Sequence, residues 1–337
     1  MAALSPVSED VAERPLARAE RRRNHDRIRL AFRIGAGIAI LVATALVVGL
    51  GPFVRGIAAI SPPSVLAALV LAVIATSAAA WRWRVVAEGY GLTLSRRAAF
   101  AAYYRSQFLN AVLPAGVLGD VHRAWVHGRG QAGLGAAAEP GLGAAPQPGL
   151  GAAARAVAVE RILGQVVQIV LTLAILLPLG FGSPLLPLAW GTGAIAVAVA
   201  VVVAAVALLP RPRRLLRQEY VLLRPVLARP WALLAIVMAS VIVVASHVAL
   251  FVVATLAVGL PLSGGIAAVG LVVLAASAIP LNVGGWGPRE AVSGAAFALV
   301  GFGASAGVSA SATFGALALI GVLPGVVVLV VGRRRRP

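Results

Sequence analysis

The 337-residue sequence has no cysteine, no lysine and few charges: 12% of its residues are charged and only 11 are acidic. The lack of cysteine excludes a disulfide framework and thiol chemistry. A soluble domain carries about 25% charged residues, so this deficit, with 60% apolar residues and a mean hydropathy of +0.95, predicts an integral membrane protein. All 29 basic residues are arginine and the net charge is +18. Because the arginines stand in short stretches between apolar runs, no nucleic-acid partner is expected.

Long charge-free runs predict an all-α fold, a polytopic bundle of membrane-crossing helices. One such helix needs about 20 largely uncharged residues. Two runs of 21 and 26 residues, 34–54 and 56–81, hold one span each. Three longer runs, each interrupted by glycine and often proline, hold two spans each: 162–210, 230–288 and 291–332. The expected total is about eight transmembrane helices.

The segment "AAFAAYYRSQFLNAVLPAGVLG" at 98–119 is ambiguous, and arginine placement arbitrates because cytoplasmic loops collect positive charge. If this segment enters the membrane and returns, 28 of the 29 arginines fall on one side and only Arg55 lies opposite. If it spans, the split becomes about 13 against 16, which shows no bias. We therefore predict a re-entrant or interfacial hairpin, with both termini cytoplasmic, in a multi-pass protein of the cell (plasma) membrane.

Other segments complete the predicted organisation. Residues 1–30 are expected to form a basic, disordered cytoplasmic tail before a membrane domain at 31–332, and 333–337 form a basic anchor. Within the membrane domain, a Gly/Ala/Pro linker occupies 128–156 and a basic cytoplasmic loop occupies 211–229. The linker repeats an eight-residue unit such as "GLGAAAEP" three times. Its G-x-G-x-x-A/P pattern has neither the preceding strand nor the following helix of a dinucleotide fingerprint, so no cofactor is expected.

The histidines and tryptophans give no strong functional signal. His122 and His127 are five residues apart and do not share a helix face, so no metal site is expected. His247 lies within the apolar stretch "VIVVASHVALF", where a neutral packing histidine is favoured over a proton relay. Trp81, Trp83 and Trp286 fit an interfacial aromatic belt.

Three polar islands interrupt the apolar sequence. They are "RSQFLNAVLPAGVLGDVHRAW" at 105–125, "VERILGQ" at 159–165 and "IPLNVGGWGPRE" at 279–290. A charge within the hydrocarbon costs at least about 2.5–3.5 kcal/mol, so it persists only where it is paired or hydrated. The candidate substrate-binding residues of the three islands are Asn110, Asp120, Arg123, Glu160, Arg161, Asn282, Arg289 and Glu290.

The spacing of these charges indicates how they pair. Adjacent residues on a helix do not face each other, so Glu160 with Arg161, and Arg289 with Glu290, are each expected to need partners on other elements. Asp120 and Arg123, at i,i+3, are close enough to meet locally. We hypothesise that three acids and three arginines frame one polar pocket near the cytoplasmic side. Positive-inside anchoring remains the alternative for Arg161 and Arg289.

Glycines and prolines accompany two of the islands. They permit or impose non-helical backbone, which is tolerated at membrane depth only where protein or water satisfies its polar groups. Broken helices of this kind often line substrate sites, and free amides at a helix start attract anions. The predicted backbone breaks are Pro114, Gly119, Pro280, Gly284, Gly285, Gly287 and Pro288.

The motifs "NAVLPAGVLGDVHRAW", "VERILG" and "IPLNVGGWGPREAVSGAAFALVGF" resemble the lysylphosphatidylglycerol synthase transmembrane-region family, also called flippase-like, over residues 35–331. The chain departs from the family pattern at Leu118, where a second glycine is common, and in the repeat linker. The family includes the membrane half of enzymes that aminoacylate phosphatidylglycerol, in which an attached soluble domain performs the transfer. The soluble stretches here are too short for that domain, so the resemblance implies the transport-like part alone.

The leading functional hypothesis is a flippase-like protein that binds or translocates an anionic phospholipid or a polyprenyl-phosphate-linked lipid. One alternative is a membrane-embedded transferase using Asp120 or Glu290 as general base, although no metal-ligand cluster, nucleophile triad or acidic pair is visible. Another is an accessory subunit of a lipid or glycan synthase, and small-residue-rich spans also permit a homo-oligomer.

Overall fold

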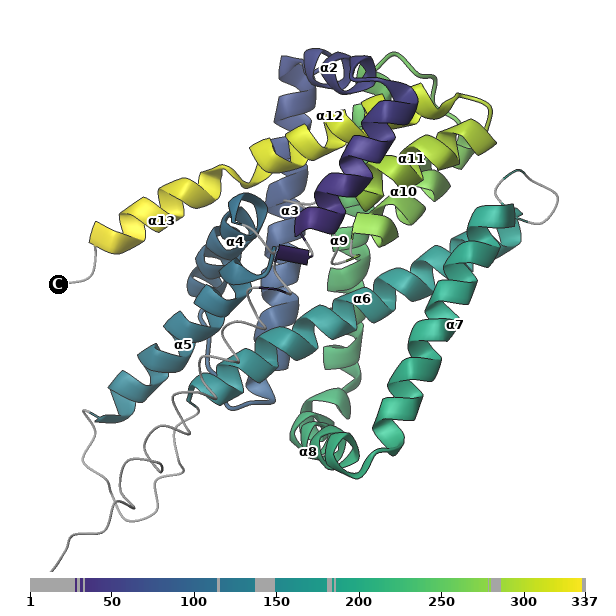
Figure 1. Cartoon of the computed structure of the whole chain (residues 1–337). Coiled ribbons are helices and arrows are strands. Elements are labelled where there is room, and N and C mark those ends of the chain that lie inside the picture. Colours follow the sequence, from purple (N-terminus) through teal and green to yellow (C-terminus); the bar gives the residue numbers. More distant parts are fainter. Residues whose placement is uncertain are drawn as a thin grey trace, which may run out of the picture.

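The computed structural model describes residues 28, 31–32, 34–113, 116–136, 149–180, 184, 186–277, 279 and 286–334 (Figure 1). These residues form helices and no β-strand, which confirms the all-α prediction. A helix at Ile34–Val48 precedes the labelled elements. They are α2 (Gly51–Ala58), α3 (Pro62–Glu88), α4 (Arg96–Val112), α5 (Leu118–Ala136), α6 (Leu150–Gly180), α7 (Leu186–Leu208), α8 (Pro210–Leu227), α9 (Pro230–Ala257), α10 (Gly264–Ser277), α11 (Pro288–Leu299), α12 (Ala304–Val322) and α13 (Pro324–Arg334).

Several helices are long and apolar enough to cross a membrane. In the described part of the chain there are four such segments: α3, α6, α9 and the continuous stretch Ala304–Val330 across α12 and α13. The helix Ile34–Val48 and α2 add a fifth if the pair, bent by 97°, is one span. This number is below the expected eight, partly because α10 and α11 contain only 14 and 12 residues, too few to cross about 30 Å of hydrocarbon alone.

The segment predicted as a hairpin, 98–119, contains most of α4 and the first two residues of α5; the two helices lie side by side (Figure 1), and α5 continues to Ala136. Helix α4 begins after Ser95, whose side chain accepts a hydrogen bond from the Ala98 amide and so caps the helix. It ends at Leu113, which has an extended backbone (φ −92°, ψ 143°), as the residue before a proline prefers. The predicted break at Pro114 itself lies outside the described residues.

Gly119 allows α4 and α5 to approach closely. A Cβ atom at this position would overlap the backbone carbonyl oxygen of Ser106, and a backbone atom cannot move aside as a flexible side chain can. We expect Gly119→Ala to destabilise the protein by about 1–3 kcal/mol or more, measured as a lower thermal unfolding midpoint in detergent. Gly151→Ala on α6 is the control, because its Cβ meets open space and alanine favours a helix. Equal midpoints for the two variants would contradict the close approach.

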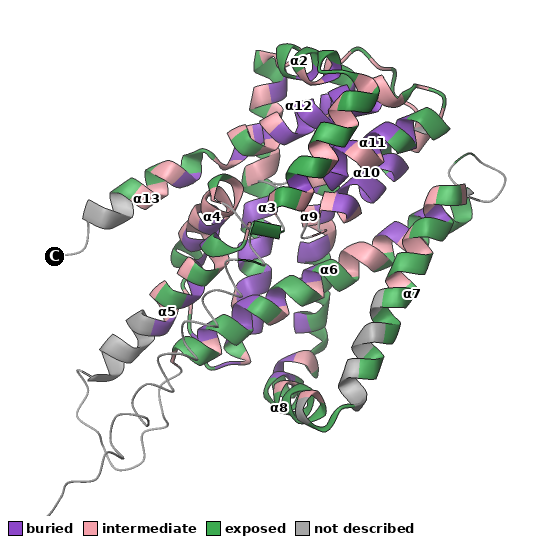
Figure 2. Cartoon of the chain, viewed as in Figure 1, coloured by how far each residue is buried: buried purple, intermediate pink, exposed green. Residues whose placement is uncertain are grey.

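The buried residues form two hydrophobic clusters. The first surrounds Trp83 and Tyr103 and joins α3, α4, α5, α6, α8 and α9. The second surrounds Phe251, Phe297 and Phe314 and is built mainly from α9, α10, α11 and α12. Figure 2 shows buried residues concentrated on the central helices, whereas α6, α7 and α8 carry many exposed ones. Many exposed side chains are large and apolar, for example Leu46 and Ile195, as expected for surfaces that face lipid.

The basic segment 211–229 largely forms helix α8 at the lower end of the bundle in Figure 1. Helices α5 and α6 extend into both ends of the predicted linker, to Ala136 and from Leu150. The linker's centre at 137–148, almost all of the predicted N-terminal tail and residues 335–337 of the predicted anchor lie outside the described residues.

Candidate functional site

A buried carboxylate on α6 collects side chains from three other helices. Glu160 is 0% exposed. Its Oε1 accepts hydrogen bonds from Arg82 Nε at 3.0 Å and Nη2 at 2.5 Å, and from the Tyr103 hydroxyl at 3.1 Å. Its Oε2 accepts from Arg123 Nη2 at 3.2 Å. Helices α3, α4, α5 and α6 therefore meet at one carboxyl group.

The second acid of this site, Asp120, stands in the first turn of α5 and pairs with Arg161, the residue after Glu160 on α6. Arg161 Nη2 lies 2.9 Å from Asp120 Oδ2, and Arg123 Nη2 lies 3.1 Å from Oδ1. The side chains of Ser106 and Asn110 on α4 donate to the same carboxylate at 3.0 and 3.2 Å. Burial alone would raise the pKa of Asp120. The facing guanidinium groups of Arg161 and Arg123 lower it by more than burial raises it, so the pKa of Asp120 lies below its ordinary value. Asp120 is therefore an anion at neutral pH.

Asn110 also fixes the start of α5. Its Oδ1 accepts a hydrogen bond from the Gly119 amide at 2.7 Å. This amide lies in the first turn of the helix, where backbone donors have no partner within the helix. One asparagine thus positions both the helix start and the Asp120 carboxylate.

Arg123 joins the two acids and carries unused hydrogen-bonding capacity. Its guanidinium lies 4.5 Å from the Trp83 ring centroid and 4.3 Å from that of Tyr103, positions that favour cation–π attraction. Its buried Nε and Nη1 have no hydrogen-bond partner among the described residues. The group of Arg82, Arg123 and Arg161 against Asp120 and Glu160 holds three positive and two negative formal charges, a net charge of +1.

A cavity of about 290 Å³ lies against this arginine cluster, between α3, α4, α6, α9 and α10. Arg82 and Arg161 line it, and the Arg161 side chain is 44% exposed. Gln165 is exposed as well, so the cavity opens along α6. The neighbouring Ile162 and Val166 are 60% and 51% exposed, which places the polar opening beside an apolar outer surface. Other polar residues of the lining include Gln107, Gln168 and His247.

The charges of the third island form a separate cluster. Arg289 Nη2 lies 2.6 Å from Glu290 Oε1. The Ser311 hydroxyl of α12 accepts a hydrogen bond from Arg289 Nε at 3.2 Å and donates one to Glu290 Oε1 at 3.1 Å. The Arg289 guanidinium lies 5.1 Å from the ring of Trp286 and 5.3 Å from that of Phe314, in the second hydrophobic cluster.

The expectation that Arg289 and Glu290 would not pair with each other was therefore wrong. Glu290 stands in the first turn of α11, and its Oε2 accepts a hydrogen bond from the Gly287 amide at 2.7 Å. The carboxylate thereby curls back past the helix end, within reach of the Arg289 side chain. The rule that adjacent side chains diverge applies to residues inside a helix and fails at this end. Pro288 starts α11, where its missing N–H costs nothing.

The structure brings together five of the predicted residues: Asn110, Asp120, Arg123, Glu160 and Arg161. The ion pairs and hydrogen bonds of Arg289 and Glu290 go to their own neighbours rather than to that group. Asn282, Pro280, Gly284 and Gly285 lie outside the described residues.

Sequence reasoning missed Arg82 and misplaced Trp83. Arg82 resembles a positive-inside anchor because it stands near the end of an apolar run, yet its side chain is only 6% exposed. Trp83 was expected in an interfacial belt, but it is 1% exposed and packs against Arg123. His247 donates from Nδ1 to the Val243 carbonyl oxygen at 2.7 Å and lines the cavity. The one sequence signal for the cavity was the pair of glutamines, Gln165 and Gln168, which follow Arg161 in a largely apolar stretch.

Several apolar helices, some long enough to span a bilayer, around a buried ionic cluster define a multi-pass membrane protein. The model of the family "lysylphosphatidylglycerol synthase TM region" matches residues 30–325, and the chain belongs to this family. The family is consistent with a membrane protein that acts on lipids. Comparison with curated proteins and with solved structures gives no match.

Proposed function

We propose that this protein binds the headgroup of an anionic lipid in the cavity beside Arg82 and Arg161, and moves the lipid between the leaflets of the plasma membrane. The observation that carries the proposal is the net positive charge of the arginine cluster against a polar cavity that opens beside lipid-facing side chains. The net charge of +1 on the cluster can balance the negative charge of a lipid phosphate. A guanidinium group can also bind a phosphate through two parallel hydrogen bonds.

The shape of the opening supports a lipid rather than a soluble anion. Ile162 and Val166 flank Arg161 on the exposed face of α6, so acyl or polyprenyl chains can remain in the bilayer while the headgroup enters. The cluster stands well inside the bundle, where charges are retained only when paired or hydrated. The arginine bias of the sequence predicts that the end of the bundle nearest this cluster faces the cytoplasm.

The bonding of the acids argues against the alternative of a membrane-embedded transferase. Asp120 accepts hydrogen bonds from Ser106, Asn110, Arg123 and Arg161, and its lowered pKa makes it a weak base. Glu290 is 0% exposed and occupied by Arg289, Ser311 and the Gly287 amide. Neither carboxylate has the free, basic oxygen that proton abstraction requires.

Arg161→Gln tests the proposal in liposomes that contain the purified protein and fluorescent phosphatidylglycerol, with dithionite quenching to report the outer leaflet. A charge-assisted hydrogen bond is worth about 1.5–3 kcal/mol, so we expect the transfer rate to fall at least about tenfold. The matched control is Arg214→Gln on the exposed side of α8, which should keep the wild-type rate. A wild-type rate in Arg161→Gln, or equal transfer of a zwitterionic phosphatidylcholine probe, would contradict headgroup binding at this cavity.

A further inference from the structure

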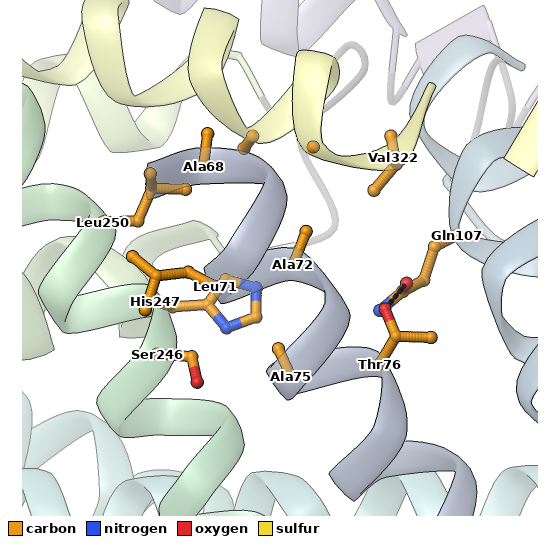
Figure 3. Close-up of a pocket in the computed structure, with 12 residues that line it drawn as sticks. Ala68, Leu71, Ala72, Ala75, Thr76, Gln107, Ser246, His247, Leu250 and Val322 are labelled. Carbon is orange, nitrogen blue, oxygen red and sulfur yellow. Dashed lines mark hydrogen bonds between the residues drawn. The ribbon is translucent and has the colours of Figure 1, made fainter. Parts of the chain in front are cut away.

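Three cavities follow one another along α9. The cavity beside the arginine cluster reaches Ser240 and His247. A second, of about 80 Å³, reaches His247 and Leu250 (Figure 3), and a third, of about 740 Å³, reaches Ala257. Ser240 and Ala257 stand 17 positions apart (257 minus 240) on one helix, which is about 26 Å at 1.5 Å per residue. That length is close to the roughly 30 Å of bilayer hydrocarbon.

The far end of this series also carries a guanidinium group. Arg55 lines the third cavity and donates from Nη2 to the Ser305 hydroxyl at 2.7 Å. It is exposed, and it is the arginine that the charge bias places alone on the side opposite the others. The series therefore starts and ends at a positive charge, so an anionic headgroup is attracted at either end.

The first two cavities meet at Gln107 and His247, which line both. There, Thr76 of α3 donates from its hydroxyl to Gln107 Oε1 of α4 at 2.7 Å, the dashed line of Figure 3. The second cavity is otherwise lined mostly by apolar side chains, and about 80 Å³ holds only a few waters. In this structure the route is closed to a lipid headgroup at two levels. One is the Thr76–Gln107 hydrogen bond, and the other is the packed second hydrophobic cluster, whose buried Phe251 and Ala254 lie on α9 between the second and third cavities.

We propose that the lipid headgroup passes from the first cavity to the third through the second, and that opening of the Thr76–Gln107 hydrogen bond between α3 and α4 is the rate-limiting step on this route. The proposal rests on the proposed function above. Opening requires α4 to move away from α3 at this level. Hydrogen bonds from Ser106 and Asn110 to Asp120 tie α4 to α5, so the two helices of the hairpin move together.

The absence of cysteine from the natural sequence permits a direct test. Thr76→Cys and Gln107→Cys are combined in one protein, which is reconstituted in liposomes with fluorescent phosphatidylglycerol and treated with a short bis-maleimide. Cross-linking should slow transfer at least tenfold relative to the same protein before treatment. The two single-cysteine variants, treated identically, should each keep their own untreated rate. Retention of phosphatidylglycerol, measured by native mass spectrometry, should be unchanged by the cross-link, because Arg82 and Arg161, which bind the headgroup in the first cavity, are unaltered.

Gln107→Ala supplies a second measurement that needs no cross-link. It removes the hydrogen bond and should raise the transfer rate at least twofold, whereas Gln218→Ala on the exposed side of α8 should not. An unchanged rate after cross-linking, or an unchanged or slower rate in Gln107→Ala, would overturn the barrier while Arg161→Gln still tests the function. Absence of any phosphatidylglycerol transfer by the wild-type protein would instead overturn the proposed function.

Discussion

Replacing Glu160 by alanine should destabilise the protein by about 3–5 kcal/mol, the cost of leaving a buried ion pair with one partner removed. Glu160 is fully buried and neutralises both Arg82 and Arg123, whose side chains are 6% and 0% exposed. Without it, the polar partners left among the described residues are the Ser240 hydroxyl for Arg82 and the Asp120 carboxylate for Arg123. The measurement is the thermal unfolding midpoint in detergent, supported by the yield of folded protein in the membrane.

Glu219→Ala is the matched control for this prediction. Its side chain is 25% exposed, and it pairs at 3.7 Å with Arg155, which is 48% exposed. Exposed pairs of this kind contribute about 0–1 kcal/mol, and loss of the Tyr90 hydrogen bond to Glu219 adds a modest further cost. If Glu160→Ala proved no more harmful than Glu219→Ala, the buried cluster would not have the energetic role assigned to it.

The second large effect is expected at Arg289. Arg289→Met keeps most of the side-chain volume but leaves the Glu290 carboxylate charged and 0% exposed, with only the Gly287 amide and Ser311 as partners. Removing one member of a buried pair costs about 3–5 kcal/mol, so the unfolding midpoint of the single variant should fall sharply.

Adding Glu290→Gln to Arg289→Met should restore much of the lost stability. Glutamine removes the buried charge while its amide oxygen still accepts the hydrogen bond from the Gly287 amide. A double variant at least about 2 kcal/mol more stable than Arg289→Met would fit the expected cost of an unpaired buried charge. A double variant that is no more stable would show that Arg289 stabilises the protein by its packing against Trp286 and Phe314 rather than by its charge.

The course of the chain was largely predictable where one physical requirement dominates. Long apolar runs predict helices because a lipid-facing backbone must satisfy its own hydrogen bonds. The arginine bias predicted a hairpin at 98–119; the chain does turn after α4 and packs α5 against it, but α5 continues to Ala136, well beyond the predicted segment. The i,i+3 spacing of Asp120 and Arg123 indicated a local ion pair, and the two side chains meet at 3.1 Å.

The pairing between helices was not predictable to the same degree. Glu160 needed a partner on another element, but the sequence could not indicate that Arg82, 78 residues away, would provide it. A charge near the end of an apolar run has the same pattern whether it anchors a helix in the headgroups or turns inward. Helix rotation and packing decide between these outcomes, and they depend on every neighbouring helix.

By itself, the sequence determined that this protein is an all-helical membrane protein whose few carboxylates require arginine partners, because hydrocarbon does not tolerate unpaired backbone dipoles or charges. Only the tertiary structure decided which charges meet. It gathered Arg82, Arg123 and Arg161 around the two carboxylates of Asp120 and Glu160, and it paired Arg289 with its own neighbour Glu290. The physical reason is that helix formation follows local composition, whereas ionic contacts between helices depend on how side chains from distant segments are oriented by packing.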